Sequence, residues 1–132
     1  MVTSLRTLVL SRAQLRKLRT LGWSVGVNAS LKWAYHDASS RWELIPWENF
    51  VISSKPVQTT LTATELLERM PRTVKRNGQT FSLRIDLLRR GAVVYYAGTG
   101  ETGGILGSAL PRPSLLDAAF DAFTEILKLK CV

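Results

Sequence analysis

The segment that decides the fold is residues 72–97, which read RTVKRNGQTFSLRIDLLRRGAVVYYA. Its first turn contains Asn77 and Gly78, and both residue types tolerate the positive φ that a tight type I′ hairpin turn requires. A two-residue turn fixes the pairing of the strands that it joins, and here it places Val74 opposite Phe81. The segment therefore predicts a β-hairpin with a defined register.

A second turn, around residues 88–91, brings a further strand back along the first hairpin. This turn places Ile85 near Val94 and Leu83 near Tyr96. Because side chains alternate across a strand, these apolar residues share the inner face of the sheet. The opposite face should be open to solvent, and it carries Lys75, Thr80, Ser82, Arg84 and Tyr95.

An earlier hairpin is expected at residues 30–47, where apolar and polar residues alternate on both sides of a short polar stretch. If that stretch is a four-residue loop, Tyr35 lies opposite Trp42 and Trp33 lies opposite Leu44. One face of this hairpin is then aromatic, and cross-strand packing explains Trp33 and Trp42 better than ligand binding does.

An N-terminal helix is expected at about residues 12–21. Ser11 and Gln14 have the spacing of a capping box, in which a hydroxyl and an amide satisfy the free backbone donors at a helix start. Gly22 is placed to end this helix. The leucines of this helix share one side of it. Basic residues occupy much of the remaining surface, and they are Arg12, Arg16, Lys17 and Arg19.

Two further helices are expected. Thr62 and Glu65 repeat the capping-box spacing before a short helix that Pro71 stops. Ser114 follows a proline and begins the last helix, which packs on the sheet. The apolar residues that recur along this last helix at helical spacing are Leu116, Ala119, Phe120, Phe123 and Leu127.

The resulting fold class is a small single α+β domain of residues 1–132, whose antiparallel sheet is built from hairpins at about 30–47 and 72–97. The N-terminal, short middle and C-terminal helices pack on it. A chain of 132 residues that is 45% hydrophobic can bury the core of one domain. Residues 53–60 are polar and contain a proline, so they read as a connector between sub-units 1–52 and 60–132.

Positive charge is concentrated in two blocks of the chain, whose formal net charge is +8. One block, residues 69–90, contains seven basic residues and a single acid, Asp86. The other block precedes Asp37 and contains no acid; its basic residues are Arg6, Arg12, Arg16, Lys17, Arg19 and Lys32. Concentrated positive charge raises the local density of polyanions. The expected partner is therefore nucleic acid, another phosphate-rich ligand or an acidic protein surface.

The predicted outer sheet face offers the best site for a nucleic-acid base. Tyr95 supplies an aromatic surface beside Arg84, and single-stranded nucleic acids bind through base stacking combined with phosphate pairing. Lys75 adds a positive charge on the same face. The residues expected to bind nucleic acid or phosphate are therefore Arg12, Arg16, Lys17, Arg19, Lys75, Arg84 and Tyr95.

A glycine-rich loop at residues 98–104 offers a second, weaker hypothesis. Gly98, Gly100 and Gly103 match the GxGxxG pattern of dinucleotide-binding folds. That pattern requires a helix directly after the third glycine within a βαβ unit, and only one helix fits into the remaining chain. A strand-to-strand loop is the plainer interpretation, although its backbone donors could wrap a phosphate of a small nucleotide.

No catalytic or metal-binding constellation is found in the sequence. His36 is the single histidine and Cys131 the single cysteine, so a transition-metal site, a thiolate zinc site and an intramolecular disulfide are all disfavoured. No serine lies in a nucleophile-elbow sequence. We therefore expect a non-enzymatic protein without cofactor or metal, with no membrane partner, located in the cytoplasm and compatible with a homo-oligomer.

The layout of residues 60–130 is similar to that of many small phage and prophage proteins: a short helix, an Asn-Gly hairpin, another strand and a closing helix. This resemblance rests on layout and transfers no site residue. It implies an accessory or inhibitor factor of a mobile element that acts on a nucleic-acid-handling target. Nucleic-acid binding is the first functional hypothesis, a protein–protein module or inhibitor the second, and a small-nucleotide binder the third.

Overall fold

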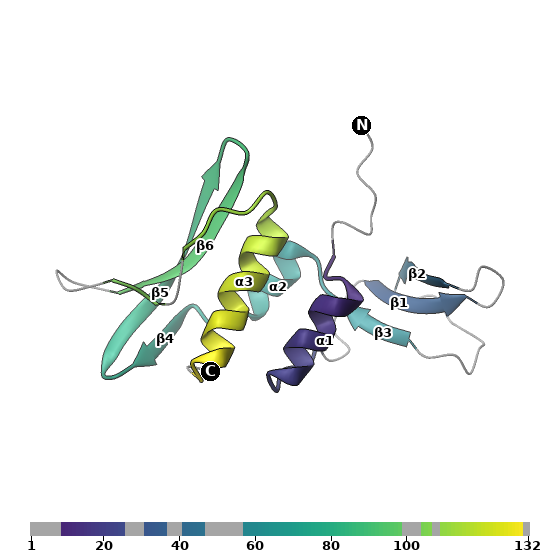
Figure 1. Ribbon diagram of the computed structural model, residues 1–132, viewed down its shortest axis with the longest axis horizontal. Coiled ribbons are helices and arrows are strands. Elements are labelled where there is room, and N and C mark those ends of the chain that lie inside the picture. The colour runs from purple at the N-terminus through teal and green to yellow at the C-terminus, as the bar shows by residue number, and fades with distance from the viewer. Residues whose placement is uncertain are drawn as a thin grey trace. The chain divides into compact units, whose positions relative to one another are not determined.

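The structure is a computed structural model that describes residues 9–25, 31–36, 41–46, 57–98, 104–106 and 109–130. These residues form three α-helices and two antiparallel sheets, which confirms the α+β class (Figure 1). The chain divides into two compact units, residues 1–65 and residues 66–132. Both expected hairpins are present, and each belongs to a sheet of its own.

The N-terminal unit contains one helix and a three-stranded sheet of order β2-β1-β3. Its elements are α1 (Arg12–Thr20), β1 (Leu31–His36), β2 (Arg41–Pro46) and β3 (Val57–Thr60). The register between β1 and β2 pairs Tyr35 with Trp42 and Trp33 with Leu44, as the sequence predicts. Pro46 ends β2, which is an edge strand where a missing backbone donor is tolerated.

Strand β3 occupies the second half of the segment that reads as a connector in the sequence. Its polar residues show no apolar alternation, yet it pairs with β1 along its whole length. Thr60 is fully buried, and its hydroxyl is satisfied by donating a hydrogen bond to the carbonyl of Leu10, at 2.7 Å. Because a buried residue of this strand is a hydrogen-bonded threonine, the hydrophobic pattern of the sequence does not predict the strand.

The carbonyl of Leu10 also accepts a hydrogen bond from the indole nitrogen of Trp33, at 3.0 Å. The Leu10 amide in turn donates to Leu61, at 2.9 Å. The whole Trp33 side chain is buried, which confirms that it is a core residue. α1 begins with the expected capping box of Ser11 and Gln14, and it buries Leu15 and Leu18.

Helix α2 (Ala63–Arg69) begins at the expected second capping box. The backbone amide of Thr62 donates to the Glu65 carboxylate at 3.1 Å, and the Glu65 amide donates back to the Thr62 hydroxyl at 3.3 Å. α2 ends two residues before Pro71, as a proline requires. Leu66 is the buried side chain of α2, and Met70 follows the helix and is also buried; both belong to the C-terminal unit.

The C-terminal unit contains a four-stranded sheet of order β4-β5-β6-β7 and the helix α3. Its elements are β4 (Thr73–Arg76), β5 (Gln79–Leu88), β6 (Gly91–Gly98), β7 (Ile105–Leu106) and α3 (Leu115–Lys128). Asn77 and Gly78 have φ values of 52° and 79°, the positive values that a type I′ turn needs. The expected pairs Val74–Phe81, Leu83–Tyr96 and Ile85–Val94 are all present.

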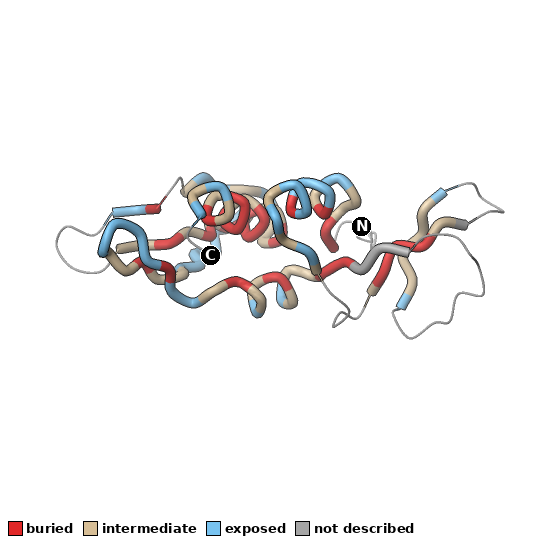
Figure 2. Tube along the Cα trace, turned by 90° about the horizontal axis from the view of Figure 1, so that it is seen from below, coloured by how far each residue is buried: buried red, intermediate tan, exposed pale blue. Residues whose placement is uncertain are grey.

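Helix α3 packs against β6 and supplies more of the buried apolar residues of this unit than any other described element (Figure 2). Four of its five predicted apolar positions are buried, and Leu127 is half-buried. On the sheet, Val94 and Tyr96 face this core, and the Tyr96 hydroxyl donates to the carbonyl of Pro71 at 2.7 Å. Ser114 caps the helix by accepting a hydrogen bond from the Asp117 amide, at 3.1 Å.

Ile85 departs from the sequence prediction. It pairs with Val94 as expected, but its side chain is 42% exposed, whereas Val94 is buried. The reason is that the β5–β6 turn extends past the N-terminal end of α3 (Figure 1), so the helix does not cover the last residues of β5. The inner face of the sheet is therefore core at one end and solvent-exposed at the other.

Candidate nucleic-acid interface

The end of the β5–β6 hairpin is the most exposed regular structure in the C-terminal unit. We call residues 84–95 the β5–β6 arm. Its strands pair without interruption from Arg84–Tyr95 to Leu88–Gly91, and Arg89 and Arg90 form the turn. Every residue from 84 to 90 is exposed. The arm is thus a hydrogen-bonded two-stranded ribbon whose β5 strand and turn are exposed.

The exposed bases of this sheet are nearly all arginines, and they are Arg72, Lys75, Arg76, Arg84, Arg89 and Arg90. In the described part of the chain, no carboxylate lies within ion-pair distance of any of them. Two of the predicted binding residues, Lys75 and Arg84, belong to this set and lie on the outer face. The structure therefore leaves their charge available to an external anion.

Tyr95 and Arg84 are direct cross-strand partners on the outer face, as predicted. The Tyr95 hydroxyl donates a hydrogen bond to the carboxylate of Asp86, at 2.9 Å. That hydrogen bond is the main reason why the pKa of Tyr95 is raised above its ordinary value, while the nearby charge of Arg84 opposes the shift. Asp86 is the single acid between residues 69 and 90, and it is held by the phenol.

The tip of the arm also exposes apolar side chains, which the sequence analysis did not single out. Leu87 is 76% exposed and Leu88 is 46% exposed. The alternation of Leu83, Ile85 and Leu87 suggests a continuous core face, and only the length of α3 shows where that face becomes exposed. The available signal was the placement of two leucines directly before the Arg89–Arg90 turn.

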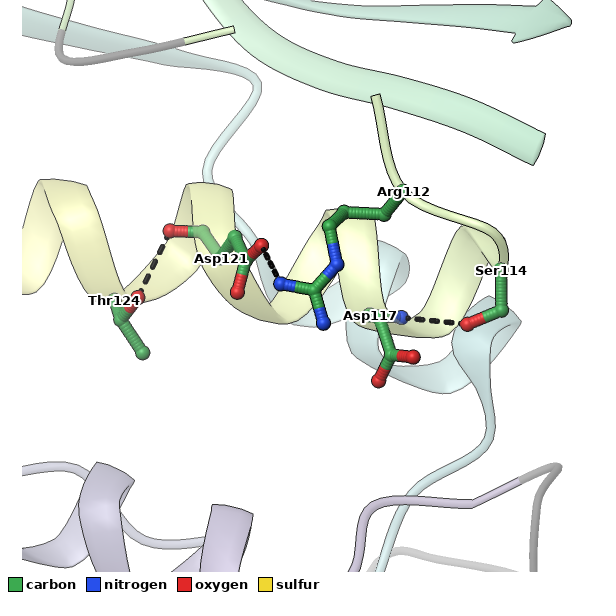
Figure 3. Close-up of polar contacts among 5 residues, drawn as sticks. All are labelled: Arg112, Ser114, Asp117, Asp121 and Thr124. Atoms are coloured by element: carbon green, nitrogen blue, oxygen red, sulfur yellow. Dashed lines mark hydrogen bonds and ion pairs between the residues drawn. The ribbon is translucent and has the colours of Figure 1, made fainter. Parts of the chain in front are cut away.

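Arg112 fastens the tip of the arm, on its β6 side, to α3 (Figure 3). The backbone amide and carbonyl of Arg112 each form a hydrogen bond with Ala92, at 2.9 Å. Its guanidinium donates to the carboxylate of Asp121 in α3, at 2.6 Å. Arg112 therefore links the start of β6 to the middle of the helix, so the β6 side of the tip is held in place.

The other predicted basic residues lie on α1, in the N-terminal unit. The guanidinium of Arg12 lies 3.7 Å from the centroid of the Trp42 ring, and Trp42 makes an edge contact with Tyr35 at 5.8 Å between centroids. A cation over an aromatic face is attracted by the ring quadrupole. Arg12 thus has a structural role, whereas Arg16, Lys17 and Arg19 are exposed on the helix surface.

The glycine-rich loop is only partly described. Gly98 ends β6, and its amide donates to the carbonyl of Gly104 at 2.7 Å, which closes the base of the loop. Gly100 and Gly103 lie outside the described residues, so the nucleotide-binding hypothesis stays a prediction. His36 ends β1.

Among the described residues, no three His, Cys, Asp or Glu side chains are grouped so that they could hold a metal ion. In the same part of the chain, no helix has the length and apolar character needed to cross a membrane. Comparison with known proteins matches the chain to no family model, no curated protein and no solved structure.

Proposed function

We propose that this protein is a non-enzymatic nucleic-acid-binding protein that contacts phosphates through the basic surface of its C-terminal sheet. The observation that carries the proposal is the set of exposed arginines on β4, β5 and the two hairpin ends, which have no carboxylate partner in the described chain. Exposed bases that remain unpaired attract polyanions and release their counterions on binding.

The chemistry of these bases favours phosphate over other anions. All of them except Lys75 are arginines, and the planar guanidinium binds phosphate through two parallel hydrogen bonds. The acid that would oppose binding, Asp86, already accepts a hydrogen bond from Tyr95. That hydrogen bond leaves the carboxylate charged, but residues 69–90 hold seven bases against this one acid, so their net charge is positive.

The spacing of the bases supports an extended ligand. β5 contains ten residues, and Arg76 precedes it by two hairpin-turn residues while Arg89 directly follows it. At about 3.3 Å per residue, the strand is roughly 30 Å long, which is close to one turn of duplex DNA at about 34 Å. A polymer with regularly spaced charges can meet both ends, whereas a single small anion cannot.

The proposal is tested by a gel-shift titration of the full chain against a 30-bp duplex and a 30-nucleotide single strand over a series of salt concentrations. The double variant Arg89→Glu/Arg90→Glu should weaken binding to unrelated sequences alike. It should also flatten the slope of log affinity against log salt by roughly 0.9 for each lost duplex contact. Both changes follow if the arginines neutralise phosphates.

The matched control is Lys128→Glu/Lys130→Glu, which changes the net charge by the same amount at the exposed C-terminal end of α3. This control should retain most of the affinity and the salt slope. Equal losses in both double variants would reduce the effect to net charge and overturn the assigned surface. Competition by polyglutamate as strong as competition by DNA would instead favour an acidic protein partner.

A further inference from the structure

We propose that the tip of the β5–β6 arm inserts into the minor groove of double-stranded DNA, with Leu87 and Leu88 as an apolar wedge and Arg89 and Arg90 as its polar end. The inference rests on the proposed nucleic-acid binding and narrows it to a duplex that the protein bends. It assigns a role to exposed leucines that the phosphate-binding surface alone does not explain.

The two leucines are exposed at the end of β5, and their cross-strand partners are small residues. Leu87 pairs with Ala92, and Leu88 pairs with Gly91. As neighbours along one strand, their side chains leave the ribbon on opposite faces. Ile85 lies on the same face as Leu87 and is also exposed, so that face stays apolar toward the root of the arm.

Apolar residues on both faces of a ribbon end favour insertion over flat docking. A flat partner surface would cover only one face and leave the other leucine in water. A groove, or the space between two base pairs, removes water from both faces at once. Leucine and isoleucine are among the side chains that architectural proteins insert between base steps from the minor groove.

The position of the arginines selects duplex DNA over a lipid surface. Arg89 and Arg90 form the turn itself, so they lie further out along the arm than Leu87 and Leu88. Insertion into a bilayer would carry both guanidinium groups ahead of the leucines into hydrocarbon, which is unfavourable. The minor groove has a strongly negative potential that attracts arginine, so the same order of residues suits it.

The arm is built to transmit force to the DNA. Its strands are paired up to the turn, and the backbone and guanidinium contacts of Arg112 hold the β6 side of its tip to α3. Unstacking a base step is costly and kinks the duplex. A ribbon held in this way can impose that deformation, and Arg84 in β5 then meets a phosphate on the bent duplex.

The experiment measures DNA bending by energy transfer between dyes at the two ends of a 30-bp duplex, together with affinity. The wild-type chain should shorten the end-to-end distance. Leu87→Ala and Leu88→Ala should each abolish most of that shortening and lower duplex affinity about tenfold. The reason is that the apolar contacts that offset the cost of unstacking are lost. Both side chains are exposed, so thermal melting should be unchanged.

A duplex with one central mismatch gives an independent readout. Its bases are already easier to unstack, so wild-type protein should bind it about tenfold more tightly than the matched duplex. Leu87→Ala should lose this preference. The control variant is Leu110→Ala, which removes a 69% exposed leucine outside the arm and should keep both bending and preference.

The outcomes separate the two proposals. Failure to bind any duplex or single strand overturns both the proposed function and the wedge. Binding that depends on Arg89 and Arg90, but without bending or any effect of Leu87→Ala, keeps the function and overturns the wedge. Tighter binding to vesicles of phosphatidylserine and phosphatidylcholine than to DNA, lost in Leu87→Ala, also overturns the wedge in favour of a lipid surface.

Discussion

The backbone carbonyl of Arg112 occupies the place where a side chain on Gly91 would begin. A Cβ atom built on Gly91 would stand 2.1 Å from the Arg112 oxygen, and the φ of Gly91 is +145°. Both the backbone conformation and the close approach exclude other residues, since L side chains rarely adopt such a φ. This contact lies at the tip of the arm, where β6 begins.

Gly91→Ala should therefore destabilise the protein by about 3 kcal/mol or more, because backbone atoms must move to admit the new methyl group. Gly78→Ala is the matched control for backbone strain alone. Its φ is +79° and the space around it is open, so a loss of about 1 kcal/mol is expected. Urea unfolding measures both, and equal losses would show that Arg112 does not crowd Gly91.

Gly78→Val should cost about 1 kcal/mol or more, because a β-branched residue resists positive φ more strongly than alanine does. The Asn77–Gly78 turn sets the register of the whole C-terminal hairpin. Thermal melting of this variant checks the turn directly. An unchanged melting temperature would contradict the type I′ geometry.

The register of both hairpins and the starts of all three helices were predictable from the sequence for local reasons. A two-residue turn at Asn77–Gly78 leaves one pairing, and the Ser11 capping box and the Ser114 cap depend on residues within one helical turn. In each case the signal and the structure lie only a few residues apart. Local chemistry thus determined these elements.

The features that escaped prediction depend on contacts between distant residues. Thr60 is buried and donates a hydrogen bond to Leu10, fifty residues away, in a polar segment that forms strand β3. Ile85 is exposed because the N-terminal end of α3 does not cover the last residues of β5. Gly91 is constrained by the backbone of Arg112. The basic and aromatic parts of the candidate site were predicted, but its apolar tip was not.

The α1 bases make a separate prediction about the N-terminal unit. If this helix contacts phosphates, Arg16→Glu/Arg19→Glu should weaken binding to all sequences equally and flatten the salt slope by about one unit per lost contact. Both side chains are exposed, so the fold should be unaffected. Equal affinity before and after the reversal would remove α1 from the interface.

Arg12 should behave differently from the other α1 bases because it lies over Trp42. Arg12→Ala removes a cation–π contact, and we expect a loss of stability of about 0.5–1 kcal/mol. Arg16→Ala is the control on the same helix and should leave the free energy of unfolding unchanged. Urea titrations of the two variants measure the difference, and identical curves would contradict a structural role for Arg12.

Tyr96 predicts a loss of stability at alkaline pH. Burial raises its pKa above the ordinary value of 10.0, so the folded state favours the neutral phenol. Its contribution is therefore complete below pH 10 and is lost as the pH rises through the folded pKa. Between pH 8 and 11, the free energy of unfolding should fall more steeply with pH for the wild type than for Tyr96→Phe, which lacks the titrating group.

At neutral pH, Tyr96→Phe should itself cost about 1 kcal/mol, because the Pro71 carbonyl loses its donor. Parallel pH profiles for the two proteins would show that Tyr96 is not protected from ionisation. Tyr95 is a useful comparison, since its raised pKa comes mainly from the hydrogen bond to Asp86. Tyr95→Phe should therefore leave the stabilising contact between Tyr96 and Pro71 intact.

Tyr95 tests whether the outer sheet face also binds single strands. Its ring lies beside Arg84 on the solvent side of the sheet, where a base could stack. Tyr95→Ala should lower affinity for a short single strand by about 1–3 kcal/mol if it does, whereas Tyr95→Phe keeps the ring and should retain that affinity. Fluorescence anisotropy with a 12-nucleotide strand, with melting curves for both variants, measures the effect. Equal losses would assign the effect to the hydroxyl and its bond to Asp86, and no loss in either would restrict binding by this unit to its arginines and the tip of the arm.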